Sequence, residues 1–75
     1  RPFQPGCLVA NLTVELIEEE FWKLEPRVKR GAFMILSGLL NRQARRVERL
    51  RRQSSLRLRR RLTKGEWTCL VYVRP

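Results

Sequence analysis

The sequence lacks two of the residue types on which most catalytic chemistry depends. Its 75 residues include no histidine and no aspartate. Histidine is the commonest general base and a common metal ligand, and activation of a serine or cysteine nucleophile usually needs it. Two cysteines, Cys7 and Cys69, are too few for a four-ligand zinc site. We therefore expect a protein that is not an enzyme and that has no catalytic residue, no metal and no cofactor.

Long apolar runs are also scarce. The longest, GAFMILSGLL at residues 31–40, is about half of the roughly 20 residues that a membrane-spanning helix needs, so we expect core or interface there and no membrane partner. No secretory leader is visible at the start of the sequence. We expect Cys7 and Cys69 to be free thiols in a reducing compartment inside the cell; the alternative is a disulfide between them.

Positive charge is the abundant feature. The net charge is +10, and eleven of the seventeen basic residues lie in residues 41–64, where Glu48 is the only carboxylate. Positive charges concentrated in this way repel one another in the folded chain. Their concentration is most easily explained by a polyanionic partner that relieves this repulsion. Ten of these eleven residues are arginines, whose planar guanidinium groups match phosphate oxygens well.

The pattern along the chain predicts four segments. Residues 1–12 form an arm or short strand, and residues 13–25 form an acidic amphipathic helix that Pro26 ends. Residues 27–53 form one helix that is apolar first and arginine-rich afterwards. Residues 55–73 form a β-hairpin, because leucines alternate with arginines before a glycine turn, and β-branched and aromatic residues follow it.

These segments predict a small single domain of the α+β class, with two or three helices, one of them long and arginine-striped, and a C-terminal β-hairpin. The alternative is a mostly α-helical hairpin that dimerises, because residues 55–62 also fit a continuing helix. So small a domain has little core of its own. We therefore expect a homodimer whose interface is formed by Phe33, Leu36, Leu39 and Leu40.

The arginine spacing predicts one continuous basic surface. On a helix, positions separated by three, four, seven and ten residues share one face, here over about 15 Å. Basic residues of the hairpin would extend this face. We expect a nucleic-acid-binding surface formed by Arg42, Arg45, Arg46, Arg49, Arg52, Arg57, Arg59, Arg61 and Lys64.

Residues 41–64 contain no aromatic residue, and the sequence lacks a DNA-binding signature such as a helix-turn-helix or a zinc finger, which favours RNA over DNA. Without aromatic side chains on which bases stack, recognition of duplex or structured RNA is favoured over single strands. We predict a nucleic-acid-binding protein, with RNA favoured over DNA, that serves as a small viral or phage regulatory protein. The alternative is a protein-interaction module whose basic amphipathic helix binds an acidic protein partner. The basic clusters also fit nuclear import signals.

Overall fold

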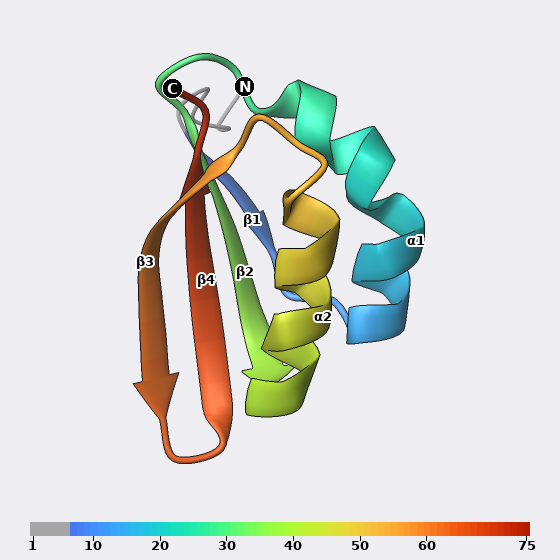
Figure 1. The fold of residues 1–75 in the computed structure, drawn as a ribbon, viewed down its shortest axis with the longest axis vertical. Helices are drawn as coiled ribbons and strands as arrows, with labels where there is room; N and C mark the ends of the chain where they lie inside the picture. The colour runs from blue at the N-terminus through green and yellow to red at the C-terminus, as the bar shows by residue number, and fades with distance from the viewer. Residues whose placement is uncertain (1–6) are drawn as a thin grey trace.

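The computed structural model describes residues 7–75, which form a four-stranded sheet and two α-helices (Figure 1). In chain order the elements are β1 (Cys7–Ala10), α1 (Val14–Leu24), the short 3-10 helix η1 (Glu25–Arg27), β2 (Phe33–Leu40), α2 (Asn41–Arg51), β3 (Arg57–Lys64) and β4 (Trp67–Val73).

The strands lie in the order β1-β2-β4-β3. The β1–β2 pair is parallel, while β4 runs antiparallel to both β2 and β3. A parallel pair needs a crossover, and α1 provides it. Helices α1 and α2 pack against each other on one side of the sheet, so the fold has two layers (Figure 1).

The core lies between these two layers. Thr13 caps α1 by accepting a hydrogen bond from the Leu16 amide at 3.2 Å, which satisfies one of the free donors at the helix start. Apolar residues at helical spacing then face the sheet. The buried core includes Ile17 and Phe21 of α1, Met34 and Leu36 of β2, Ala44 and Val47 of α2, and Leu70 and Tyr72 of β4.

The predicted α+β class is confirmed, and the mostly helical alternative is wrong. The predicted helix over residues 27–53 is also wrong, because its apolar half is strand β2 and the helix begins only at Asn41. β2 has apolar residues on both of its faces, and a short apolar run of this kind fits a buried strand and a core helix equally well.

The start of α2 is fixed by contacts with the hairpin. The Asn41 side chain donates to the Gly65 carbonyl at 3.2 Å and accepts from the Thr68 hydroxyl at 2.5 Å. The Gln43 side chain accepts from the Leu40 amide at 2.9 Å. The Gln43 bond satisfies the Leu40 amide at the helix start, and the two Asn41 bonds attach that start to the hairpin. The chain therefore changes from strand to helix between Leu40 and Asn41.

Within residues 7–75, no helix has the length and apolar composition needed to cross a membrane. Cys7 and Cys69 are free thiols. One strand, β2, lies between them in the sheet, and Cys69 is four residues along β4 from Val73, the position in line with Cys7 through Phe33. The alternative of a disulfide between them is therefore wrong.

Candidate functional site

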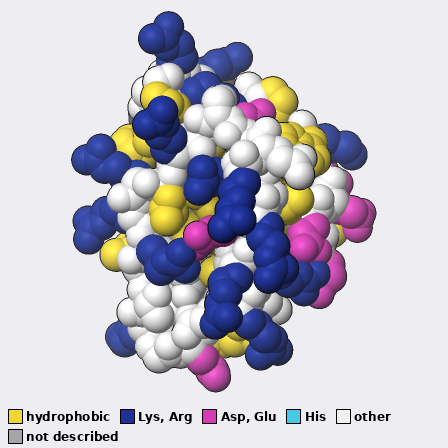
Figure 2. Space-filling view, in the orientation of Figure 1, with side chains coloured by type: hydrophobic (Ala, Val, Ile, Leu, Met, Phe, Trp, Pro, Cys, Tyr) yellow, Lys and Arg dark blue, Asp and Glu magenta, His cyan; other side chains and the backbone are white. Residues whose placement is uncertain are grey.

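Most arginines of α2 face away from the core, as their spacing predicts, whereas Arg51 is partly buried. Arg42, Arg45, Arg49 and Arg52 are exposed. Figure 2 shows basic side chains down the middle of the molecule and along the side of β3, whereas acidic side chains gather over α1. The surface is therefore divided by charge, with the negative part on α1 and the positive part on α2 and the hairpin.

Arg46 differs from its neighbours because it joins the two helices. Its Nε lies 3.0 Å from Glu18 Oε2 and its Nη2 lies 2.5 Å from Glu18 Oε1, while Nη1 is 4.0 Å from Glu15. A bidentate arginine–carboxylate pair of this kind is stronger than a hydrogen bond between neutral groups. The hydrogen bonds from Arg46 lower the pKa of Glu18, and the same bonds raise the pKa of Arg46. Arg46 therefore has a structural partner inside the chain.

The basic residues of β3 do not all point the same way. A β-bulge lies between Leu58 and Arg60, so the alternation of sides shifts by one residue at Arg59. Arg61 faces the helix layer and forms an ion pair with Glu48 of α2. Arg57 is opposite Val73 and Arg60 is opposite Val71. Sequence reasoning missed Arg60, because simple alternation placed Arg61 where Arg60 lies.

A buried phenol, that of Tyr72, lies near the Glu48–Arg61 ion pair. Tyr72 is completely buried, and its hydroxyl makes no hydrogen bond within the described residues. Burial raises the pKa of Tyr72, and the nearby charge of Glu48 raises it further, against the opposite effects of Arg51 and Arg61. The phenol therefore stays protonated and contributes packing.

The residues predicted for a dimer interface are divided between core and surface. Leu36 and Leu39 are completely buried inside the chain itself, so they are not available to a partner. Phe33 and Leu40 are partly buried. Phe33 is opposite Val73 on the side of the sheet away from the helices. The homodimer stays a prediction, and at most two of the four residues expected at its interface are accessible to a partner.

The side of the sheet away from the helices is a second surface, which we call the open face. The strand registers place its residues in rows across the sheet. Three of its apolar side chains are strongly exposed: Val9 at 62%, Trp67 at 51% and Leu62 at 47%. Large contiguous apolar patches on a protein surface are typical of interaction sites. The open face comprises Cys7, Val9, Phe33, Ile35, Leu40, Arg57, Arg60, Leu62, Lys64, Trp67, Cys69, Val71 and Val73.

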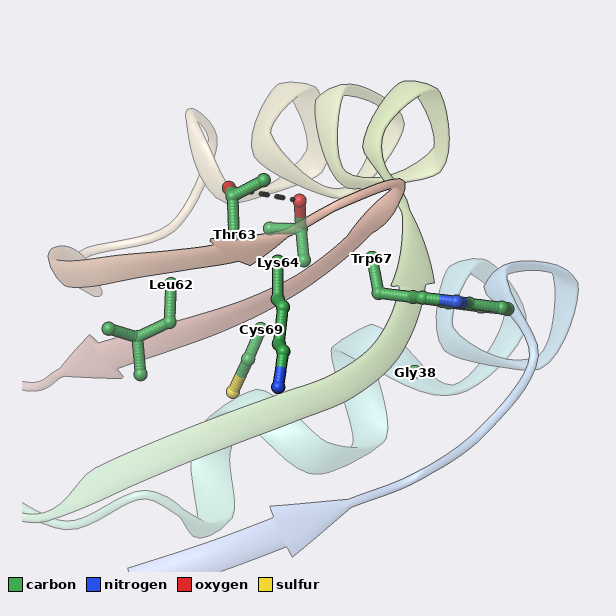
Figure 3. Close-up of a pocket in the computed structure, with 7 residues that line it drawn as sticks. Gly38, Leu62, Thr63, Lys64, Trp67 and Cys69 are labelled. Atoms are coloured by element: carbon green, nitrogen blue, oxygen red, sulfur yellow. Dashed lines mark hydrogen bonds between the residues drawn. The ribbon is translucent and has the colours of Figure 1, made fainter.

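The open face contains a hollow of about 260 Å³ beside the hairpin. It lies next to Gly38, which has a φ of +77° at a β-bulge of β2 and contributes no side chain. Figure 3 shows Leu62, Lys64 and Cys69 on one side of the hairpin and Thr63 on the other. The residues that line the hollow are Gly38, Leu62, Thr63, Lys64, Trp67, Thr68 and Cys69.

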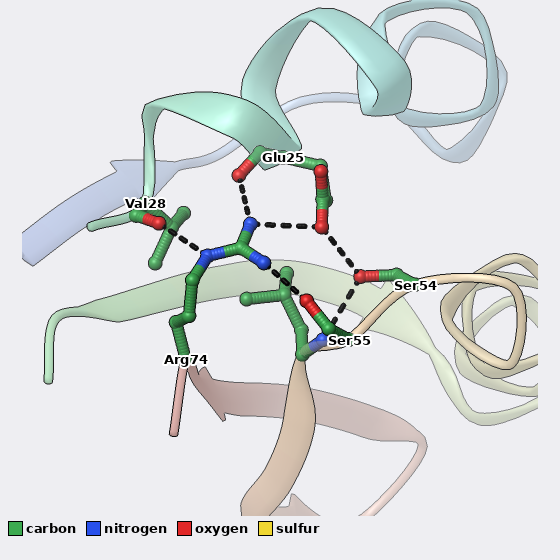
Figure 4. Close-up of polar contacts among 6 residues, drawn as sticks. Glu25, Val28, Ser54, Ser55 and Arg74 are labelled. Carbon is green, nitrogen blue, oxygen red and sulfur yellow. Dashed lines mark hydrogen bonds and ion pairs between the residues drawn. The ribbon is translucent and has the colours of Figure 1, made fainter. Parts of the chain in front are cut away.

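Arg74 holds together three segments at the opposite end of the sheet (Figure 4). Its Nε donates to the Val28 carbonyl at 2.6 Å, and its Nη2 donates to the carbonyl of Glu25 at 2.6 Å and to its carboxylate at 2.8 Å. Nη1 donates to Ser55, and the same Glu25 carboxylate accepts from Ser54 at 2.8 Å. Sequence reasoning missed this cluster because 49 residues separate Arg74 from Glu25.

The fold places the chain among small α+β units in which helices cover one face of a four-stranded sheet. Residues 4–75 match the family model described as ribosomal protein L11 methyltransferase (PrmA). Because the match covers nearly the whole chain, the chain belongs to this family.

One similar solved structure is the ribosomal protein L11 methylase from Lactobacillus delbrueckii subsp. bulgaricus. Its TM-score is 0.83 at 22% sequence identity, over 92% of this chain and 36% of that chain. The likeness shows the fold, and the chain spans about a third of the length of that methylase. Among curated proteins, no match was found.

Family membership corrects the function predicted from charge. The prediction of a nucleic-acid-binding regulator, viral or from a phage, is wrong, because the matching family is one of methyltransferases. The prediction that the protein is not an enzyme is wrong for the same reason. The absence of histidine limits only the chemistry that these 75 residues can perform, and it says nothing about the remainder of a longer enzyme. An acidic protein or a nucleic acid as partner of the arginines stays a prediction.

Proposed function

We propose that this chain is the part of a ribosomal protein methyltransferase that binds the ribosomal protein substrate. The observation that carries the proposal is the exposed apolar surface of the open face in a member of this family. The similar solved protein is described as a methylase of ribosomal protein L11. Since the chain spans 36% of that protein, we assign the methyl-transfer chemistry to the remaining length of the enzyme.

The open face suits a protein partner better than a small molecule. It is broad, and its apolar residues come from all four strands of the sheet. Trp67 lies half-exposed in this surface, and tryptophan is among the residues that most often dominate the binding energy of protein interfaces. A substrate protein would cover these side chains and gain hydrophobic stabilisation from them.

The proposal also gives a location. An enzyme that binds a ribosomal protein acts inside the cell, and this agrees with the intracellular, reducing compartment expected from the free cysteines. The expected nuclear import role of the basic clusters has no support in the family match.

The test is calorimetric titration of the 75-residue chain with purified ribosomal protein L11. We expect a 1:1 complex with a Kd of about 1 µM, which corresponds to roughly −8 kcal/mol. Because the chain carries a net charge of +10, the titration is repeated at about 150 mM and about 500 mM salt to remove non-specific attraction. An unrelated ribosomal protein serves as the control. Equal affinity for both proteins, or none for L11, would contradict the proposal.

A further inference from the structure

The hollow of the open face has the size of a site for one side chain. Its volume of about 260 Å³ is below the roughly 300–1,000 Å³ of pockets that hold small-molecule ligands. The bulge at Gly38 opens it, Leu62 and Cys69 contribute its apolar lining, and Trp67 lies beside it. Pockets of this kind, next to an aromatic residue, accept the anchor side chains of protein partners.

Lys64 is the only charged residue that lines the hollow, while Glu66 lies outside the lining in the turn next to it. Arg57 and Arg60 lie on the same edge strand of the open face as Lys64. None of the residues that form the open face, as defined above, is acidic. A partner that covers this surface gains most if it brings carboxylates to these cations.

A second copy of the chain does not fit this requirement. Two open faces packed together would each contribute the same three cations and no carboxylate, and each copy carries a net charge of +10. Repulsion between like charges would oppose such a pair. The occupant is therefore a different protein, with an apolar side chain and an acidic one close together.

We propose that the hollow binds one apolar side chain of the ribosomal protein substrate, in a segment that also places a carboxylate against Lys64. This inference rests on the proposed function. The apolar side chain fills the space beside Gly38 and packs on Trp67. The carboxylate pairs with the Lys64 ammonium at the rim. The hollow thus selects the segment of the substrate that the enzyme holds.

Trp67 and Trp22 provide a matched pair of substitutions. Trp22 lies on α1 and is 46% exposed, against 51% for Trp67. We expect Trp67→Ala to weaken the binding of ribosomal protein L11 at least about 10-fold in calorimetric titrations, as for other interface anchors. Trp22→Ala should leave the Kd within about 2-fold. Circular dichroism checks that both variants fold.

The carboxylate contact is tested by charge reversal. Lys64→Glu should weaken binding more than Lys29→Glu, which reverses an exposed charge in the turn before β2. The difference should shrink at high salt, because rim charges are screened. Equal effects of the two reversals would overturn the carboxylate contact.

The native cysteines give a readout that needs no change at Trp67. Cys69 lines the hollow, whereas Cys7 lies on β1 at the other edge. In a Cys7→Ser chain, saturating L11 should slow alkylation of Cys69 at least about 10-fold, as expected for a fully covered interface centre. L11 could bind without slowing Cys69 alkylation and without loss of affinity in the Trp67→Ala chain. The hollow would then not be the binding site, and the proposed function would stand. If the unchanged chain does not bind L11, the proposed function itself fails.

Discussion

At the scale of single residues, Gly38 and Gly31 have nearly the same left-handed backbone but different surroundings. Their φ angles are +77° and +79°. A Cβ on Gly38 would lie 2.6 Å from the side-chain oxygen of Asn11, whereas a Cβ on Gly31 meets nothing within 4 Å. The backbone strain alone costs an alanine about 1–2 kcal/mol.

We expect Gly38→Ala and Gly31→Ala each to lower the free energy of unfolding by about 1–2 kcal/mol in urea titrations. The Asn11 side chain is exposed and can rotate away, so the steric contact should add little. The double variant Asn11→Ala with Gly38→Ala measures that addition. A much larger loss at Gly38, relieved by Asn11→Ala, would show that Asn11 is held in place.

Arg74 is the side chain on which the most polar contacts converge. Its side chain is 18% exposed and that of Glu25 14%, so removal of either charge leaves the other largely buried without an opposite charge. We expect Arg74→Ala to cost about 2–4 kcal/mol of unfolding free energy. Arg74→Lys should recover little, because an ammonium cannot reach two carbonyls and a carboxylate at once. Arg30→Ala, at an exposed turn, is the control, and an equal cost there would contradict the role of Arg74.

At the scale of elements, the Glu18–Arg46 pair couples α1 to α2 in a way that depends on pH. The pKa of Glu18 is lower in the folded chain than its ordinary value, because Arg46 donates hydrogen bonds to it. Its contribution to stability is therefore fully present above the ordinary glutamate pKa of about 4.3. The contribution is lost as the pH falls through the lowered value of the folded state.

The expected measurement is the urea midpoint of the unchanged chain and of Glu18→Gln between about pH 7 and pH 2.5. The unchanged chain should be the more stable at neutral pH, and the gap should close as the pH falls below about 4. Glu19→Gln, which removes a charge from an exposed position of the same helix, should show a smaller gap at neutral pH. A gap for Glu18→Gln that does not change with pH would contradict the coupling.

Elements with a clear period were predictable, and the exceptions have local causes. The stripe of Ile17 and Phe21 predicts α1, and the glycine turn predicts the hairpin. Strand β2 was missed because it is apolar on both faces, with Leu and Met where a strand more often has Val and Ile. The alternation of leucine and arginine in β3 correctly predicts the side of the sheet on which Arg57 lies. After Arg59 it predicts the wrong side, because no residue type marks the bulge there. Because β2 was predicted as part of a helix, the open face could not be recognised from the sequence.

At the scale of the whole molecule, the net charge of +10 should reduce stability at low salt. Arginines on the outer face of α2 repel one another and gain nothing from the core. We expect the double variant Arg45→Gln with Arg49→Gln to raise the melting temperature by roughly 2–4 °C at about 20 mM salt. The gain should vanish at about 500 mM salt. Arg27→Gln, a change outside this cluster, is the control, and a lower melting temperature of the double variant would contradict the prediction.

The topology of the sheet also sets an order of assembly. The β3–β4 hairpin pairs across the two-residue turn at Gly65 and Glu66, whereas β1 must find β2 after the whole of α1 and η1 has been placed. Contacts between residues close in sequence form first, because they lose less chain entropy. β1 is four residues long and pairs on one side only. We therefore expect β1 to join the sheet last and to leave it first, so that amides of residues 8–10 exchange with deuterium well before those of β4.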